Sequence, residues 1–200
     1  MTRQRGRPRE YDAATALQAA GQVFWAQGFS ATSLDDLSVA MGMNRPSIYR
    51  AFGDKEAIYR LTLAEFARRM AEAFERTLGV EPDLRKGLKS FYRGALDVYC
   101  REDAELGCMV MCTAPAAAVA HPEVQAELAN VIATLDEKLL ACVTAALEQG
   151  QIARPADAKV LSKLLQAVLH SLALRARAGE TRASLRRFAD GAIKTVLGDG

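Results

Sequence analysis

The chain has 200 residues, half of them hydrophobic, which is enough for one sizeable domain or for a small domain fused to a medium one. Its formal net charge of +2 is too small to indicate or exclude a nucleic-acid partner. The longest weakly polar stretch covers the 13 residues 108–120 and contains Thr113 and Pro115, so we expect no membrane span. The N-terminus is polar and basic with no apolar run behind it. We therefore expect no signal peptide, a cytoplasmic location and four reduced cysteines.

The first ten residues carry arginine at every second position from Arg3 to Arg9, against a single acid. A flexible basic arm that precedes a DNA-binding unit can reach into the adjacent minor groove. Arg5 and Arg7 of this arm, residues 1–10, are therefore candidate DNA contacts. The alternative is a solvated tail without a role in binding.

Three short helices are predicted next, the first over residues 13–27. The second begins after Ser33, whose side chain is suited to cap a helix N-terminus, and stops at Gly42, where a left-handed residue is favoured. Asn44 is the N-cap candidate of the third helix. Two short helices joined by a tight turn have the layout of a helix-turn-helix, in which the first helix braces the second inside a DNA major groove.

The third helix of this trio carries few apolar residues, and Ile48 and Phe52, four apart, anchor it to the core. Its other side chains are suited to contacts with phosphates and base edges. We assign Arg45, Pro46 and Ser47 to base edges. Phosphate contacts are assigned to Tyr49, Thr32, Ser33 and Lys55. The full set predicted here is Thr32, Ser33, Asn44, Arg45, Pro46, Ser47, Tyr49, Arg50 and Lys55. A helical hairpin without a DNA role is the alternative.

Helical spacing dominates the rest of the chain, and strand signals are nearly absent. The predicted helices cover residues 55–78, 84–100, 108–120, 122–149, 156–178 and 182–197. The first of them is long enough to join the trio to a larger unit. Together these segments predict an all-α fold of about nine helices, with an N-terminal three-helix helix-turn-helix head and a C-terminal helical body.

The segment from residue 11 to 59, about a quarter of the chain, resembles the DNA-binding domain of the TetR family of bacterial transcriptional regulators. The matching pieces are AAGQVFWAQGF at 19–29, TSL at 32–34 and GMNRPSIYRAFGDKE at 42–56. Two positions depart from the pattern, since Ala51 stands where many members carry His and Gly53 where many carry Pro or another small residue. These departures bear on one phosphate contact.

This resemblance implies a DNA-binding head at residues 11–56 and a ligand-sensing, dimerising body at residues 57–200. It also implies a homodimer that usually represses transcription and leaves its palindromic operator when a small-molecule inducer binds. Two heads about 34–36 Å apart would read successive major grooves of such a site. A body of this type would hold a cavity enclosed by its fourth to eighth helices. Candidate lining residues are Phe66, Met70, Tyr92, Tyr99, Met109, Met111 and His170, and plain core packing is the alternative for each.

The last two predicted helices carry more apolar surface than a terminal hairpin needs for one face of its own body. Pairing two such hairpins about a two-fold axis gives a four-helix bundle, which is our prediction for the dimer interface. Packing within one chain is the alternative. The residues assigned to the interface are Leu161, Leu164, Leu165, Val168, Leu172, Phe188, Ala192, Ile193 and Val196.

Three cysteines fall within thirteen residues. Cys108 and Cys112 are four apart on one predicted helix face, and Cys100 closes the preceding helix. Such thiols could form a redox or electrophile sensor or bind Cu(I), so a thiol- or copper-responsive regulator is an alternative function. A helix N-terminus lowers a thiol pKa, which favours Cys108 as the reactive group. Ordinary core packing is the other interpretation, and the spacing is not that of a zinc site.

The sequence offers little for catalysis. His121 and His170 are its two imidazoles, and we find no nucleophile triad, phosphate-binding glycine loop or metal carboxylate motif. We therefore predict a non-enzymatic protein without a cofactor or a metal. A helical scaffold that does not bind DNA remains the alternative from another class.

Overall fold

The computed structural model describes residues 12–101, 105–152 and 157–198, and the predicted arm with Arg5 and Arg7 lies outside them. No β-strand forms within these ranges, where Cys100 and Glu105 make one isolated antiparallel bridge. The described residues form nine helices: α1 (Ala13–Gln27), α2 (Leu34–Met41), α3 (Arg45–Phe52), α4 (Lys55–Arg76), α5 (Leu84–Tyr99), α6 (Met109–Ala118), α7 (Pro122–Glu148), α8 (Ala158–Arg177) and α9 (Arg182–Leu197). The predicted all-α class is confirmed.

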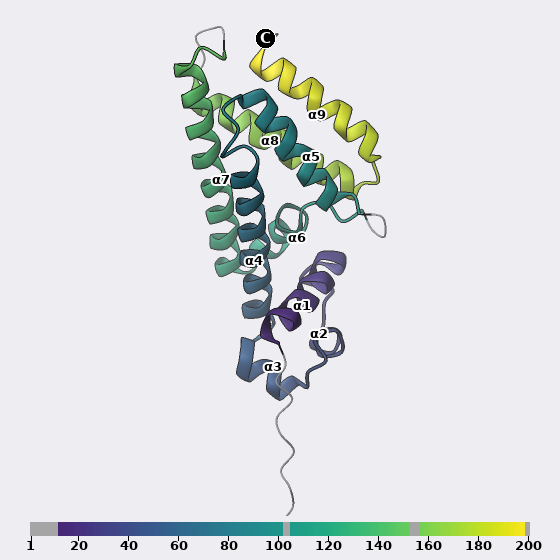
Figure 1. Cartoon of the computed structure of the whole chain (residues 1–200). Coiled ribbons are helices and arrows are strands. Elements are labelled where there is room, and N and C mark those ends of the chain that lie inside the picture. The colour runs from purple at the N-terminus through teal and green to yellow at the C-terminus, as the bar shows by residue number, and fades with distance from the viewer. Residues whose placement is uncertain (1–11, 102–104, 153–156, 199–200) are drawn as a thin grey trace, which may run out of the picture.

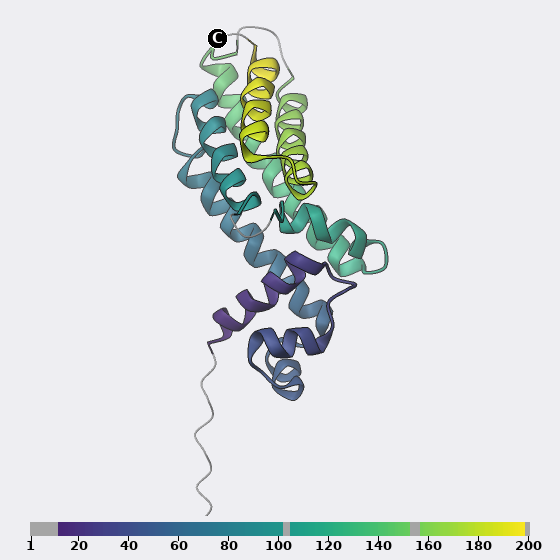
Figure 2. The same cartoon turned by 90° about the vertical axis from the view of Figure 1, so that its right-hand side faces the viewer.

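The head consists of α1, α2 and α3 at one end of an elongated molecule (Figures 1 and 2). Its centre is formed by Phe24, Leu37 and Ile48, one from each helix, and all three are fully buried. Burying large side chains of this kind stabilises the head by about 1.5–3 kcal/mol each. The helix spacing noted in the sequence therefore produces a small core of its own.

Helix α4 starts in the head and runs along the body, where it lies beside α7 (Figure 1). The body is completed by α5, α8 and α9, with α8 packed against both α7 and α9. The shorter α6 lies where the body meets the head and contacts α1, α4, α7 and α8. Because α4 is one continuous helix, a displacement of its body end would be carried to the head by a single rigid element.

Local chemistry explains where most helices begin. Asp12, Ser33, Asn44 and Asp54 each accept a hydrogen bond from a backbone N–H in the first turn that follows, which satisfies a donor that the helix itself leaves unpaired. Helix α6 lacks such a side-chain cap and contains Pro115, and it ends two residues before the predicted boundary at residue 120. The proline nitrogen has no hydrogen to donate within the helix.

Candidate nucleic-acid interface and ligand cavity

The turn between α2 and α3 has the predicted geometry. Ser33 and Asp36 form a reciprocal capping box at the start of α2. Gly42 has φ 62°, a left-handed conformation that glycine adopts without steric cost, and Met43 is buried in the angle between the helices. The side chain of Asn44 then accepts the N–H of Ser47 at 2.9 Å and starts α3.

One surface of α3 faces solvent, and it is the predicted one. Arg45, Pro46, Tyr49 and Arg50 are exposed, and Ser47 is half-buried. The guanidinium of Arg45 forms an ion pair with Asp35 of α2 at 2.6 Å, which orients the side chain along the surface of the head. Two arginines, a tyrosine hydroxyl and a serine thus share the outer side of the second helix, an arrangement suited to phosphate and base contacts.

Two predicted phosphate contacts serve inside the protein instead. Thr32 is buried, and its hydroxyl donates to the Gly28 carbonyl at 2.7 Å, so the prediction that this side chain holds phosphate is wrong. The Lys55 ammonium donates to the carbonyls of Phe29 and Thr32, both at 3.0 Å, and lies 4.3 Å from the centre of the Phe29 ring. Lys55 therefore braces the loop between α1 and α2. The side chains of Ser33 and Asn44 are likewise engaged as caps.

Several contacts that no sequence pattern indicated fix the head to the body. The indole N–H of Trp25, at the end of α1, points to the carbonyls of Leu106 and Gly107 at 3.2 Å each. Arg177, the last residue of α8, donates to the Trp25 carbonyl at 2.9 Å and to the Ala26 carbonyl at 3.2 Å. These carbonyls lie at the negative end of the α1 dipole, where a cation is favoured.

A second group of contacts joins α4 to α6 and to the loop after it. The Tyr59 hydroxyl and the Thr113 hydroxyl are 2.6 Å apart in the interior. His121 Nδ1 lies 2.8 Å from a carboxylate oxygen of Glu56, and its ring packs edge-on against Phe29 of the head. The middle of α6 is therefore tied to α4, and the loop after it touches the head through Phe29.

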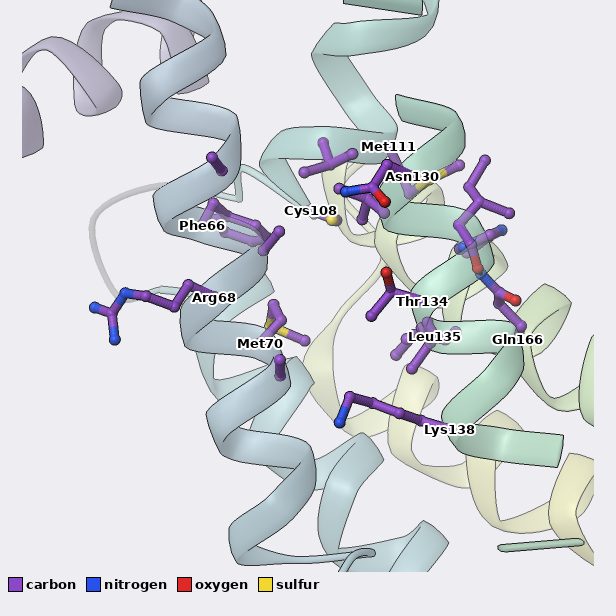
Figure 3. A pocket seen from close by; sticks show the side chains of 18 of the residues that line it. Phe66, Arg68, Met70, Cys108, Met111, Asn130, Thr134, Leu135, Lys138 and Gln166 are labelled. Carbon is purple, nitrogen blue, oxygen red and sulfur yellow. The ribbon is translucent and has the colours of Figure 1, made fainter. Parts of the chain in front are cut away.

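A cavity of about 330 Å³ opens in the body between α4 and α7. Figure 3 shows Phe66 and Met70 of α4 facing Thr134 and Leu135 of α7 across it, with Arg68 pointing away. Its volume lies at the small end of the range for sites that bind small molecules. Of the predicted lining residues, the structure brings together Phe66, Met70, Tyr99, Met111 and His170.

Two of the predicted lining residues belong to the core and do not border this cavity, so their assignment is wrong. Tyr92 is buried, and its hydroxyl donates to the Leu165 carbonyl at 2.7 Å between α5 and α8. Met109 is buried at the first position of α6. Gln166, Phe91 and Cys108 line the cavity although the sequence analysis did not select them. Helical spacing shows which side chains point inward, and it does not show which of them meet a void.

The ionisable groups deep in the cavity are held in their neutral forms. Burial raises the pKa of the Tyr99 hydroxyl well above its ordinary value and raises the pKa of the Cys108 thiol to about 11. Burial also lowers the pKa of His170, against the opposing influence of Asp136. These three side chains are therefore uncharged at neutral pH, whereas Glu127 and Lys138 add charged groups to the lining.

The cysteines depart from the predicted thiol chemistry. Cys108 stands at the N-cap position of α6, yet its pKa rises because burial outweighs the favourable backbone hydrogen bonds at the helix start, so the expectation of a lowered pKa is wrong. Burial also raises the pKa of Cys100 and of Cys112. Within the described residues, no three His, Cys, Asp or Glu side chains gather as a metal site requires. The geometry therefore gives no support to a thiol- or copper-responsive site.

The predicted dimer surface is partly interior. Leu161, Leu165, Leu172 and Ile193 are buried within the chain, so their assignment to an interface is wrong. The other predicted residues are exposed or half-buried, and α8 adds Val160 and Leu174, which the sequence analysis did not select. The resulting apolar face, here called the α8–α9 face, consists of Val160, Leu164, Val168, Leu174, Phe188, Ala192 and Val196.

An exposed, basic second helix after a tight glycine turn, on an all-α scaffold, defines a helix-turn-helix DNA-binding protein. Comparison with known families agrees with this class. Residues 16–61 match the bacterial regulatory proteins of the tetR family, and residues 85–192 match the tetracyclin repressor-like C-terminal domain. The chain belongs to the TetR family of transcriptional regulators.

Individual relatives support the same assignment. The chain is 25% identical over 190 residues to the HTH-type transcriptional repressor ComR of Escherichia coli, covering 94% of this chain and 90% of the relative. The repressor BdcR of the same organism is 30% identical over 106 residues, covering 53% and 54% of the two chains. A cysteine variant of the TetR-family regulator CifR, solved with a 26-bp operator DNA, is 28% identical with a TM-score of 0.81, covering 94% and 98%.

These findings make the chain a DNA-binding transcriptional regulator and not an enzyme, which excludes the non-DNA scaffold. None of the helices in the described ranges combines the length and apolar character needed to cross a bilayer.

Proposed function

We propose that this regulator is a small-molecule-responsive repressor that binds a palindromic operator as a homodimer and is released when an effector occupies the cavity. One observation carries the proposal. Phe66, in the wall of the cavity, packs edge-to-face against Trp25 of α1, with ring centroids 5.2 Å apart and planes at 79°. The effector site and the DNA-binding head thus share a direct aromatic contact.

A second route runs through α6. Its first turn borders the cavity through Val110 and Met111, and Thr113 in the next turn meets Tyr59 of α4. The Tyr59 ring packs against Phe24 of the head with centroids 4.9 Å apart. An occupant that shifts this wall therefore changes how the head sits on the body. It acts only to the extent that it binds the DNA-free arrangement more tightly than the DNA-bound one.

The α8–α9 face supports the homodimer. Val160 and Leu174 are each 53% exposed and Leu164 is 46% exposed, along one side of a helix. An apolar strip on a regulator that reads two half-sites fits an isologous contact, in which each subunit offers the same surface. The heads of such a dimer would engage successive major grooves about 34–36 Å apart. In this proposal, residues 11–56 bind DNA, and residues 57–200 bind the effector and form the dimer. Helix α4 begins at Lys55 and crosses this boundary.

Release is tested with promoter DNA in a gel-shift assay while Trp25 fluorescence is followed. Trp25 is the single tryptophan of the chain, so its emission reports on the junction of head and body. Compounds that release the DNA are expected to change this emission in the DNA-free protein. Ala71→Phe, which fills the cavity, should abolish release, whereas Ala133→Phe on the exposed side of α7 should retain it. Release that survives Ala71→Phe would refute the proposal.

The roles on α3 are tested by a pair of variants. Arg45→Ala is expected to cost about 1–3 kcal/mol of binding and to relax base preference at one position, because a base contact is lost. Tyr49→Phe should weaken all sites to a similar degree, because only a phosphate contact is lost. Affinities for an operator and its single-base variants measure both. An equal loss of specificity in the two variants would contradict this division of roles.

A further inference from the structure

Asp35 of α2 holds the Arg45 side chain by one edge of its guanidinium. The carboxylate oxygen Oδ1 accepts a hydrogen bond from Arg45 Nε at 3.0 Å and lies 2.6 Å from Arg45 Nη2. Asp35 takes no part in the capping box of α2, because the neighbouring Asp36 makes those bonds with Ser33. The Asp35 carboxylate is therefore available to the first residue of α3.

This ion pair adds little to the stability of the free protein. The Arg45 side chain is 54% exposed and the Asp35 side chain is 72% exposed, so water screens their attraction. Its effect is on orientation. Arg45 stands at the N-terminal end of α3, where the helix dipole disfavours a cation, and a carboxylate from the preceding helix offsets that repulsion. The guanidinium is thereby kept beside the end of α3.

The bond pattern decides which donors of Arg45 remain for DNA. A guanidinium carries five N–H groups, one on Nε and two on each terminal nitrogen. Nε and one N–H of Nη2 are directed to Asp35, which leaves Nη1 and the outer N–H of Nη2. These donors form the parallel fork at the tip of the side chain. Such a fork matches the O6 and N7 acceptors of guanine in the major groove.

The charge of Asp35 favours a base over a phosphate at this fork. A phosphate also accepts two parallel N–H bonds from arginine. It would bring a second negative charge close to the carboxylate that holds the other edge of the same guanidinium, whereas the edge of guanine carries no net charge. Adenine presents a donor at N6 beside its N7 acceptor, so it cannot accept both N–H groups.

We propose that Asp35 is a positioning residue for DNA recognition, which aligns Arg45 so that the tip of its side chain reads a guanine in each half-site. The inference rests on the base contact assigned to Arg45 in the proposed function. It adds the identity of the base and the residue that orients the side chain. Asp35 acts through Arg45 and needs no DNA contact of its own.

Selection from randomised DNA tests the identity of the base. The full chain is incubated with random duplexes of about 30 bp, long enough for two half-sites one helical turn apart, and the bound fraction is sequenced. The parent chain is expected to select a guanine at one position of each half-site, and Arg45→Ala should no longer select it. In anisotropy titrations, exchange of that G·C pair for A·T in one half-site should weaken binding by the parent about tenfold.

Variants of the two neighbouring acids test the role of Asp35. Asp35→Ala should reduce the tenfold preference to about threefold or less, because Arg45 is no longer aligned. Its affinity for a scrambled duplex should rise about twofold, since a negative charge near the phosphates is removed. A merely structural role would instead lower the affinity for both duplexes. When Arg45 is already Ala, adding Asp35→Ala should not change the base preference further.

Asp36→Asn is the matched control, because it removes the same charge one residue away and leaves the partner of Arg45 in place. It should raise the affinity for the scrambled duplex by a similar factor and retain the tenfold preference. Far-ultraviolet circular dichroism at the temperature of the titrations confirms that each variant is folded.

Three results would overturn the inference: a tenfold preference that persists in Asp35→Ala, an equal loss of preference in Asp36→Asn, or a base other than guanine at the position that depends on Arg45. If Arg45→Ala changes no position, the base contact in the proposed function fails as well. The selection contains no effector, so release of DNA by small molecules is tested separately. A guanine preference that depends on Asp35 stands even if no compound releases the DNA.

Discussion

At the scale of single residues, Lys55 shows that a basic side chain at a helix N-terminus can stabilise a neighbouring loop and need not bind an anion. Its ammonium contacts two backbone carbonyls and the face of Phe29, so the cation is paired with dipoles and a ring. Hydrogen bonds to a charged group contribute about 1.5–3 kcal/mol, more than a neutral pair. The loop between α1 and α2 is therefore held by a side chain that the sequence pattern assigned to phosphate.

Replacing Lys55 by Met should lower the free energy of unfolding by about 1–3 kcal/mol and leave the salt dependence of DNA binding unchanged. Arg50→Met, on the exposed side of α3, should instead leave stability within about 0.5 kcal/mol and reduce the slope of log affinity against log salt by about 1. Urea unfolding and binding titrations at several salt concentrations measure both. A reduced slope in Lys55→Met would restore the phosphate role.

The raised pKa of Cys108 gives a pH prediction. Burial moves this pKa from 9.0 to about 11, so the folded state favours the neutral thiol. The stability that this provides is complete below the unfolded pKa and is lost as the pH rises through about 11. Alkylation of Cys108 by iodoacetamide in the native protein should keep increasing up to that pH. In urea, the rate of alkylation should level off near pH 9.0; mass spectrometry follows the reaction in both cases. A native plateau near neutral pH would indicate a reactive thiolate after all.

At the scale of elements, the helix boundaries follow closely from local chemistry, because caps and glycines act within one turn. The predicted ranges 13–27 and 182–197 coincide with α1 and α9. The packing between helices cannot be predicted from one sequence, since it depends on which helix faces meet. The assignment of Leu165 and Leu172 to an interface failed for this reason, because α8 contacts α5, α6, α7 and α9 within its own chain.

The hydrogen bonds from Arg177 of α8 to the end of α1 can be tested directly. Arg177→Met removes donors to the last carbonyls of α1 and should lower the free energy of unfolding by about 1–3 kcal/mol. Amide hydrogen exchange in the last turn of α1 should accelerate at the same time. Arg175→Met is the matched control, since Arg175 is exposed and pairs with Glu180 on the other side of α8. Similar exchange at α1 in both variants would argue against a specific bond.

At the scale of the whole molecule, the proposed homodimer would form through the α8–α9 face, so this face would determine whether two heads can act together. Leu164→Glu combined with Leu174→Glu places two charges on that face and should shift the protein from dimer to monomer in sedimentation experiments. Val119→Glu, at a residue that is 88% exposed near α6, should not change the assembly. The double variant should also retain only the weak affinity of a single head for DNA. A dimer that persists would place the interface elsewhere.

The single span of α4 has a mechanical consequence. Its 22 residues extend about 33 Å at 1.5 Å per residue. A tilt of only about 5° about the C-terminal end of α4 would carry its N-terminal end sideways by about 3 Å, close to the length of one hydrogen bond. Recognition of bases tolerates far less misalignment than that. In the proposed homodimer, an effector that tilts α4 by a few degrees would therefore displace both heads from the grooves that they read.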